Sequence, residues 1–393
     1  MPKAQVGTVV SNHFQRLWIT LGFQPVFLWS DTLIYILLLC GGVWLGFALR
    51  REYWRVALRQ VAADRMAMIS FAILCLYGAV GFLDTLHFRV ISPSNHVGGG
   101  NIQSVMDLLC APLIERTEKT YSTPFATHLF TKETVLTPDG RQVREYPPLQ
   151  YPGSHILGTD KTGQDVLYIS LKSIRTGLII GTLTTLIVTP FAILCGVLAG
   201  YFGGWVDDII QYVYSTLESI PDILLIAAAM LIFQVGLTEE ETIISADKRL
   251  VYLCVIMGIT SWTGLCRLIR AEVLKLREIE YVQAADAFGV GRARIMLRHL
   301  VPNVMHIVLI SIVLRFSGLV LAEAVLAYVG IGVDPSMQSW GNMINQARLE
   351  LARDPVVWWN LFAAFAFMLG LVLPANLFGD AVRDALDPRL RTQ

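Results

Sequence analysis

The chain has 393 residues, of which 54% are hydrophobic and 16% are charged, and its formal net charge at pH 7 is zero. Soluble domains usually carry about a quarter charged residues, so this composition excludes an ordinary water-soluble protein. The balanced charge offers no broad basic surface, so no nucleic-acid partner is expected.

Seven apolar stretches are expected to cross a membrane as helices: 32–49, 66–83, 178–199, 209–237, 250–266, 304–326 and 356–379. A spanning helix needs about 20 mostly apolar residues. The stretch 17–30 is also apolar, but it is too short to cross and is broken by Pro25. We expect it to lie in the membrane interface, with Trp18 and Trp29 as anchors.

Positive charge is unevenly divided between the connecting segments. Fifteen Lys and Arg residues lie in 50–65, 267–303 and the C-terminal tail, whereas six lie in the N-terminus, 238–249 and 328–355. Short loops rich in Lys and Arg stay in the cytosol. This bias predicts a cytosolic C-terminus and, with seven spans, an extracytoplasmic N-terminus.

The segment 84–175 differs in composition from the rest of the chain. It holds three glycines at 98–100, a polar stretch at 115–123 and Pro-rich turns at 147–148 and 152–153. It falls outside in the predicted topology, and it is long enough to be translocated regardless of its charge. We expect a small extracytoplasmic subdomain here.

Charged residues inside apolar stretches are costly in lipid and are by default functional. Glu218 and Asp222 flank Pro221 in the fourth stretch, and they mark either a function or a helix end that reaches interfacial water. Arg315 and Glu323 are eight residues apart, within one broad helix face. They could pair or line a translocation path, or Glu323 could instead support the structure at the outer interface.

Sequence motifs of enzymes are missing from the chain. No HExxH, GxSxG or GxxxxGK[ST] pattern occurs, and the six cysteines show no spacing typical of zinc ligands or of a disulfide framework. We expect no catalytic, cofactor-binding or metal-binding residue in this chain. An intramembrane hydrolase would need paired catalytic residues, and no such pair is apparent.

The segment 278–288 consists of good helix formers and is followed by Gly289, a usual residue just past a helix end. Ala284 and Ala285 would give this short helix a flat, small surface suited to a groove of a partner protein. Pro302 falls near the start of the next span, where a missing N–H costs little. Taken alone, the pattern also fits an ordinary connecting loop, which is the commoner case.

This segment resembles the Glu-Ala-Ala…Gly…Leu-Pro loop of ABC-transporter permeases. The matching positions are Gln283, which replaces the usual acid, Ala284, Ala285, Gly289 and Pro302. Further blocks resemble the dipeptide/oligopeptide permease family, and these are 155–166, 200–208, 321–332, 339–343 and 379–389. Several blocks in the right order are a more specific signal than one short motif. The resemblance covers roughly residues 150–393.

The resemblance implies an all-α integral membrane protein with the six-span core of a type I ABC importer permease. One extra N-terminal span and an extracytoplasmic insert would be added to that core. The expected divisions are an N-terminal extension (1–65, with the interfacial segment, the extra span and a basic cytosolic loop), a first core span (66–83), the insert (84–160) and the permease core (161–393, with a cytosolic coupling loop at 267–303).

The resemblance further implies a permease subunit in the bacterial cytoplasmic membrane, forming half of a pathway for di- or oligopeptides or similar solutes. Its segment 278–303 would couple transport to ATP hydrolysis. The expected partners are a second permease subunit, two cytosolic ATPase subunits that bind ATP and Mg²⁺, an extracytoplasmic solute-binding protein and membrane lipid. The alternatives are a permease for a non-peptide solute such as a nickel chelate, and a membrane scaffold whose outer insert recruits a partner.

Overall fold

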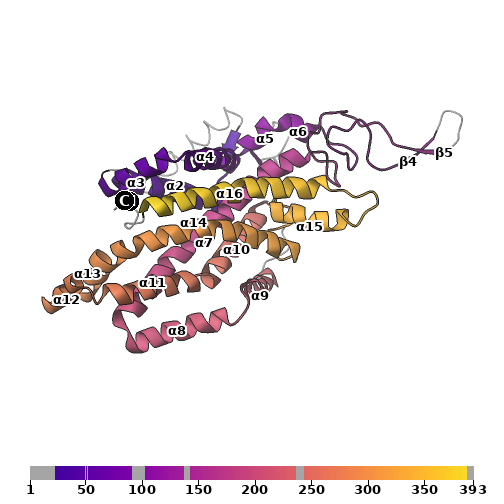
Figure 1. Ribbon diagram of the computed structural model, residues 1–393. Coiled ribbons are helices and arrows are strands. Elements are labelled where there is room, and N and C mark those ends of the chain that lie inside the picture. Colours follow the sequence, from indigo (N-terminus) through magenta and orange to yellow (C-terminus); the bar gives the residue numbers. More distant parts are fainter. Residues whose placement is uncertain are drawn as a thin grey trace, which may run out of the picture.

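The computed structural model describes residues 23–48, 50, 52–90, 102–136, 142–235 and 243–386. Over these residues the chain is mostly helical, as expected, and its long helices form one bundle (Figure 1). The helices are α2 (Trp29–Ala48), α3 (Glu52–Ala63), α4 (Arg65–Thr85), α5 (Val105–Leu109), α6 (Ala111–Glu115), α7 (Val166–Phe202), α8 (Gly204–Glu218), α9 (Asp222–Val235), α10 (Ile243–Thr260), α11 (Thr263–Leu276), α12 (Glu280–Ala287), α13 (Arg292–Ile295), α14 (Val301–Tyr328), α15 (Trp340–Glu350) and α16 (Trp359–Leu386), with a π-helical turn, Met296–Leu300, between α13 and α14.

The described chain also contains short strands, which corrects the all-α expectation. The strands β1 (Phe23–Pro25), β2 (His87–Val90) and β3 (Ile102–Ser104) form an antiparallel sheet in the order β1-β2-β3. The strands β4 (Glu133–Leu136) and β5 (Gln142–Glu145) form a separate hairpin. Each strand has only three or four residues, too few for an alternating pattern to be recognised in the sequence.

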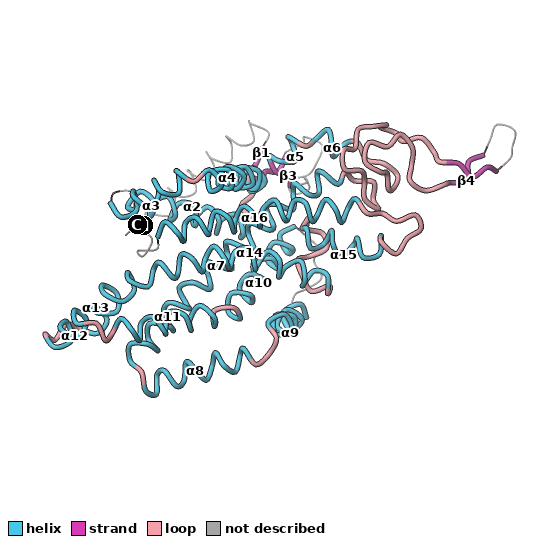
Figure 2. The backbone as a smooth tube through the Cα atoms, viewed as in Figure 1, coloured by secondary structure: helices cyan, strands magenta, loops and turns pink. Residues whose placement is uncertain are grey.

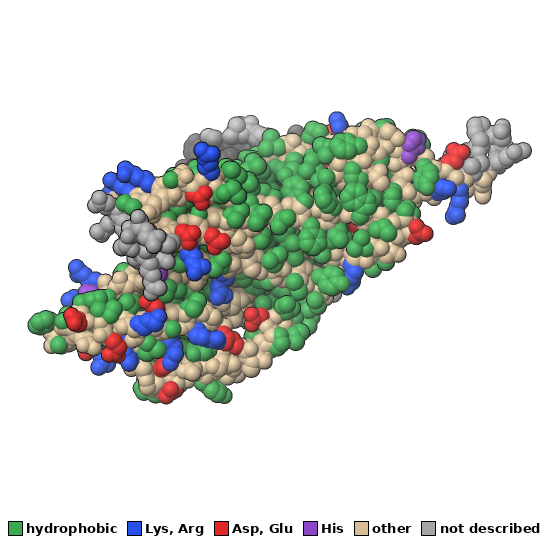
Figure 3. Space-filling model, viewed as in Figure 1, with side chains coloured by type: hydrophobic (Ala, Val, Ile, Leu, Met, Phe, Trp, Pro, Cys, Tyr) green, Lys and Arg blue, Asp and Glu red, His purple; other side chains and the backbone are tan. Residues whose placement is uncertain are grey.

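The two ends of the bundle differ. Helices α12 and α13 lie at one end, and the β4–β5 hairpin projects from the opposite end (Figure 1). Long loops gather at the hairpin end, whereas the α12 end is built mainly of helices (Figure 2). On the face shown in Figure 3, apolar side chains cover the middle of the bundle and many charged side chains lie toward the α12 end. An apolar middle section suits a bundle surrounded by lipid.

Five helical segments of the described chain are long and apolar enough to cross a membrane. They are Arg65–Thr85, Val166–Phe202, Ala246–Leu276, Arg292–Tyr328 and Trp359–Ala385. Each contains or largely overlaps one of the expected spans 66–83, 178–199, 250–266, 304–326 and 356–379. In place of the expected first span, α2 has a shorter apolar section, Trp29–Val43.

The expected span 209–237, which Glu218 and Asp222 interrupt, is broken into two helices. Helix α8 ends at Glu218, α9 begins at Asp222, and the two helices are bent by 87° at the break between them. Pro221 lies in this break, and proline cannot donate the backbone hydrogen bond that would continue α8. If the bent pair counts as one span, the described chain has up to six spans.

Helix α7 is the central helix of the bundle and packs against α4, α10, α11 and α14. Its contact with α11 depends on Gly196 and Gly200, one helical turn apart. A β-carbon would lie 2.8 Å from Ile269 Cβ at the first position and 2.7 Å from Val273 Cβ at the second. Small residues at this spacing let two membrane helices approach closely.

The expected loops on the α12 side are largely helical. The basic segment 50–65 contains α3, whose Ala57 and Val61 pack with residues of α16 such as Ala385. Much of the expected coupling loop 267–303 belongs to α11, α12, α13 and the π-helical turn. Of the interfacial segment 17–30, residues 17–22 lie outside the described residues, as does the rest of the N-terminus.

The N-terminal extension is fixed to the core by a buried ion pair. Arg175 of α7 contacts Asp31 of α2 through Nη2 at 2.6 Å and through Nε at 3.1 Å. The Asp31 carboxylate also contacts His87 Nδ1 at 2.9 Å, and Arg175 Nη2 lies 3.8 Å from an oxygen of Asp247 in α10. Asp31 is completely buried, so this pairing fixes where α2 begins.

The residues on either side of the β4–β5 hairpin, 116–132 and 146–165, fold onto the hairpin end of α15 and α16. Trp359 Nε1 donates to the Thr159 carbonyl at 2.9 Å, and its ring meets Phe130 edge-on with centroids 4.9 Å apart. Tyr121 donates to Glu350 at 3.1 Å. Burial together with Glu350 raises the pKa of Tyr121 to about 12, and burial also raises the pKa of Glu350. These contacts make both stretches part of the folded body.

Candidate functional site

Helix α12 is the surface helix expected at 278–288, and its observed bounds are Glu280–Ala287. Gln283 and Ala284 are exposed, and Val282 is buried on the opposite side. Ala285 is only partly exposed and packs against the core beneath the helix. Of the two alanines, Ala284 is therefore the one that offers a free surface.

The end of α12 has the geometry that the sequence predicts. Gly289 has a φ of +74°, a left-handed conformation that disfavours any residue with a β-carbon. Its N–H bonds to the Asp286 carbonyl at 2.9 Å, and the Val290 N–H bonds to the Ala285 carbonyl at 3.0 Å. This pair of bonds is a Schellman motif, which ends the helix and turns the chain toward α13.

Large apolar side chains on α12 and at its two ends are exposed. Phe288 is 87% exposed, Tyr281 43% and Ile279 41%. They lie within five residues of exposed Ala284 along the chain, and α12 lies at the tip of the molecule (Figure 1). A short helix that carries exposed apolar side chains is suited to a groove of another protein.

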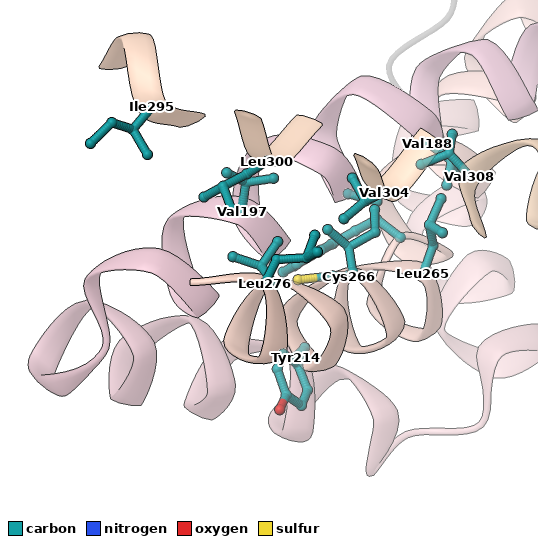
Figure 4. Close-up of a cluster of buried hydrophobic side chains, with 14 of the residues drawn as sticks. Val188, Val197, Tyr214, Leu265, Cys266, Leu276, Ile295, Leu300, Val304 and Val308 are labelled. Carbon is teal, nitrogen blue, oxygen red and sulfur yellow. The ribbon is translucent and has the colours of Figure 1, made fainter. Parts of the chain in front are cut away.

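A continuous apolar core connects α12 to the long helices. We call it the α12 core, and it consists of Val188, Ala192, Val197, Tyr214, Trp262, Leu265, Cys266, Ile269, Val273, Leu276, Val282, Ile295, Leu300, Val304 and Val308. Figure 4 draws most of these side chains: the labelled ones from α7, α8, α11 and α14 lie close together, and Ile295 of α13 lies to one side of them. Because tightly packed side chains transmit displacement, a movement of α12 would be passed to α7, α11 and α14.

Pro302 is the second residue of α14, near the start of the span as expected. The π-helical turn precedes it, and there the Val301 N–H bonds to the carbonyl of Met296, five residues earlier. This wider turn brings the chain to a proline that cannot itself donate a backbone hydrogen bond. Asn303 then donates to the Tyr281 hydroxyl at 2.9 Å, which ties α14 to α12.

A cavity of about 410 Å³ lies among α9, α10 and α14. Two helix breaks contribute to its walls. Asp222 begins α9 just after the break between α8 and α9, and Ser261 lies in the break between α10 and α11. Backbone without regular hydrogen bonding is tolerated at membrane depth only where it is buried in protein or lines a water-filled cavity. Two breaks at one cavity therefore mark it as the candidate pathway of this chain.

Arg315 projects into this cavity from the middle of α14 and donates through Nη1 to the carbonyl of Ser261. Its Nε is buried without a hydrogen-bond partner. Among the residues that the structure describes, no carboxylate lies within 4 Å of its guanidinium. Arg315 is thus an intramembrane cation held by a backbone carbonyl and facing open space.

Glu323 lies away from this cavity. Its side chain is buried, accepts a hydrogen bond from Ser339 Oγ at 3.1 Å and is also held by the backbone N–H of Gly341. The structure therefore brings Glu323 to the segment that begins α15 and does not pair it with Arg315. This placement favours a supporting role for Glu323 over pairing with Arg315 or lining a translocation path.

The block 155–166, one of those that carry the family resemblance, organises the start of α7. Asp165 caps the helix by accepting from the Leu167 N–H at 2.8 Å, and it contacts His155 Nδ1 at 2.9 Å. Gly163 has a φ of +77° and lies so close to Glu118 that a β-carbon would be 1.7 Å from the Glu118 carbonyl oxygen. The geometry gives this block a structural role.

Comparison with known proteins identifies the family. The model of the family "Binding-protein-dependent transport system inner membrane component" matches residues 192–392. This chain belongs to that family. The match contains α12, Pro302 and the cavity with Arg315, so the candidate site lies within the family domain. The protein is therefore a membrane-embedded permease subunit of an ABC transporter.

Several relatives are permeases of peptide transport systems. An oligopeptide transport system permease protein OppC of Mycobacterium tuberculosis is 36% identical over 245 residues, which is 62% of this chain and 79% of that protein. The dipeptide transport system permease protein DppC of Bacillus subtilis is 33% identical over 60% of this chain and 69% of its own length. The glutathione transport system permease protein GsiD of Pectobacterium atrosepticum is 31% identical over 67% of this chain and 83% of its own length.

Proposed function

We propose that this permease subunit imports di- or oligopeptides or closely similar solutes. The names of its relatives support this substrate class, since they include oligopeptide, dipeptide and glutathione permeases. The observation that carries the mechanism is the α12 core, which joins an exposed surface helix to α14, a helix that lines the cavity, and to α11, which begins two residues after Ser261 in the cavity wall. Such a link can convert movement at α12 into a change in the shape of the cavity.

In this proposal α12 is the coupling helix and docks in a groove of a cytosolic ATPase subunit. Ala284 and Gln283 face the groove, and exposed Phe288 adds apolar contact area. Ala285 anchors the helix to the α12 core, while Gly289 and Pro302 set the turn into α14. The family usually has an acid at position 283. Here the exposed Glu278 supplies a carboxylate beside Gln283, whose Nε2 donates to it at 3.4 Å.

The complex that we propose contains a second permease subunit, two ATPase subunits and an extracytoplasmic solute-binding protein, all surrounded by lipid. ATP and Mg²⁺ would bind to the ATPase subunits, since this chain has no GxxxxGK[ST] motif. Arg315 would line the translocation pathway, and Glu323 would support the segment leading into α15. No nucleic acid takes part.

The proposed orientation places the α12 end in the cytosol and the hairpin end outside the bacterial inner membrane. The unequal distribution of Lys and Arg supports it. Helix α2 would be an extra first span that follows an extracytoplasmic N-terminus, and 84–160 would be an extracytoplasmic insert. The core 161–393 would contain the remaining spans, with the bent α8–α9 pair as one of them.

Crosslinking tests the coupling assignment. A cysteine introduced by Ala284→Cys should crosslink to the ATPase subunit in the assembled complex, because Ala284 is exposed at the tip. The matched control is Leu297→Cys, which is exposed on the neighbouring π-helical turn rather than on α12. In the same complex, Ala284→Glu should abolish peptide uptake while the subunit still inserts. Normal uptake by this variant, together with no crosslink at 284, would reduce α12 to a connecting helix.

A further inference from the structure

We infer that Arg315 is the carboxylate-binding residue of the translocation pathway and that it binds the free C-terminal carboxylate of the peptide during transport. This inference rests on the proposed function, because it assigns chemistry to the pathway that the proposal places at this cavity. The ligand class is a zwitterionic peptide with a free carboxylate at one end and a free ammonium group at the other.

The first argument is the unusual state of the Arg315 charge. An arginine in the middle of a membrane helix is costly and normally pairs with an acid. Within the part of the chain that the structure describes, Arg315 has only the Ser261 carbonyl as a bonded partner, and its Nε has none. A carboxylate is the partner that best fits the planar fork of donors that a guanidinium presents.

The second argument is the surroundings of this cation. The other lining side chains are mostly apolar, among them Ile226, Met257, Leu314 and Leu319, and the hydroxyls of Ser261 and Ser311 also line the cavity. In a mostly apolar cavity, a small number of polar groups fixes the orientation of a ligand. Apolar walls accept varied side chains, so the charge at Arg315 is left to recognise a group that peptides share.

The third argument is the position of Asp222, the one acidic side chain among the described residues that line this cavity. Asp222 stands at the first residue of α9, after the break at Pro221. It lies on a different helix from Arg315 and is near enough to interact with it electrostatically, but the described residues show no ion pair within 4 Å between the two. The cavity thus offers separate negative and positive groups, which complement the ammonium and carboxylate ends of a zwitterion.

The test uses the complete transporter in proteoliposomes, with the binding protein loaded to saturation before transport begins. Three probes are compared by initial uptake rate: tri-alanine, tri-alanine amide and N-acetyl-tri-alanine. We expect the wild type to import tri-alanine about ten-fold faster than the amide, the factor typical of losing one charge-assisted hydrogen bond. Arg315→Gln should bring the acid-to-amide ratio close to one.

Three further variants separate recognition of charge from structural damage. Arg315→Lys keeps a positive charge and a donor for the Ser261 carbonyl, so it should retain a preference for the free acid. The wild type should also import tri-alanine faster than N-acetyl-tri-alanine, and Asp222→Asn should lose this second preference while keeping the acid-to-amide preference. Arg348→Gln, which removes an exposed cation from α15 outside the cavity, is the matched control and should behave as wild type.

The outcomes distinguish this inference from the proposed function. If the wild-type complex imports none of the three peptides, peptide import itself is wrong. If it imports the acid and the amide at equal rates, or if Arg315→Gln keeps the wild-type ratio, the carboxylate assignment is wrong while peptide import stands. If Arg315→Lys loses the preference for the free acid as completely as Arg315→Gln does, the carboxylate assignment is also wrong. The positive charge at position 315 would then not be what recognises the peptide.

Discussion

Ala284 and Ala285 show how much a single position along a helix matters. They are adjacent in the sequence, but Ala284 is exposed and Ala285 is partly buried against the α12 core. A bulky residue at 285 would first disturb the packing of this chain, whereas the same residue at 284 would disturb only what binds to α12. For this reason substitutions at 284 report on docking, and substitutions at 285 mix docking with folding.

Gly289 gives a prediction at the same scale. Its left-handed backbone penalises a β-carbon by about 1 kcal/mol or more, and a β-branched residue suffers most. The space around it is open, since a β-carbon at this position would meet no atom within 4 Å, so the cost is one of backbone conformation alone. Gly289→Val should therefore misdirect the turn into α13 and strongly reduce ATP-driven uptake, measured in membrane vesicles.

Gly289→Asn is the control for that measurement, because asparagine tolerates the left-handed region better than other residues. It should keep most of the uptake. Both variants should still insert in the membrane, as judged by the amount of subunit recovered there. Wild-type uptake by the Val variant would mean that the Schellman turn is unimportant for coupling.

Helix packing is decided at the scale of whole elements, and the α7–α11 contact shows its physical basis. Lipid tails are as apolar as leucine, so membrane helices gain little from apolar area alone and depend on close approach. Gly196 and Gly200 provide this approach, and their neighbours on α11 are β-branched Ile269 and Val273. The resulting interface is part of the α12 core.

Gly196→Ala should destabilise this interface, although alanine is the better helix former. The added methyl group would lie 2.8 Å from Ile269 Cβ and 2.9 Å from the Cys266 carbonyl oxygen, so the helices must separate. Overpacking of this kind costs roughly 1–3 kcal/mol. We expect a lower thermal unfolding temperature of the purified complex. Gly42→Ala in α2, where nothing lies within 4 Å, should leave that temperature unchanged or raise it.

The β4–β5 hairpin is the element most separate from the body of the molecule (Figure 1). Replacing 133–145 by a short glycine turn should leave the packing of Trp359 intact, because the partners Phe130 and Thr159 remain. If the hairpin helps to dock the binding protein, the concentration of loaded binding protein needed for half-maximal uptake should rise. Assembly with the ATPase subunits should not change.

Trp359→Ala is the contrasting variant, since it removes a buried side chain that holds the residues on either side of the hairpin, 116–132 and 146–165, on α16. It should cost about 3–5 kcal/mol of stability and lower the yield of assembled complex. An unchanged uptake curve after removal of the hairpin would show that this element plays no part in docking.

At the scale of the whole molecule, the two ends should face opposite sides of the membrane. In a cysteine-free background, Lys119→Cys at the hairpin end should react with a membrane-impermeant thiol reagent in intact cells. Gln60→Cys on exposed α3 should react only after the membrane is opened. The reverse pattern would overturn the proposed orientation. Ser122 is unsuitable for this purpose because it is fully buried.

The sequence by itself determined the features that depend on neighbouring residues or on the bilayer. Runs of about 20 apolar residues are required to cross lipid, so five spans could be located that match or largely overlap observed helical segments. The helix ending at Gly289 followed from local chemistry, because only glycine takes the left-handed conformation at little cost. The family-like spacing from Gln283 to Pro302 also lies within a local stretch.

Only the tertiary structure decided which distant groups meet. The bend at Pro221 turns the expected fourth span by 87°, although its composition reads as a single apolar run. Arg315 is held by Ser261, 54 residues away, and Glu323 by Ser339, so two charges on one helix have different surroundings. Apolar periodicity cannot separate such positions, because a membrane helix is apolar toward lipid and toward protein alike, and the packing of neighbouring helices alone selects which charge faces the cavity.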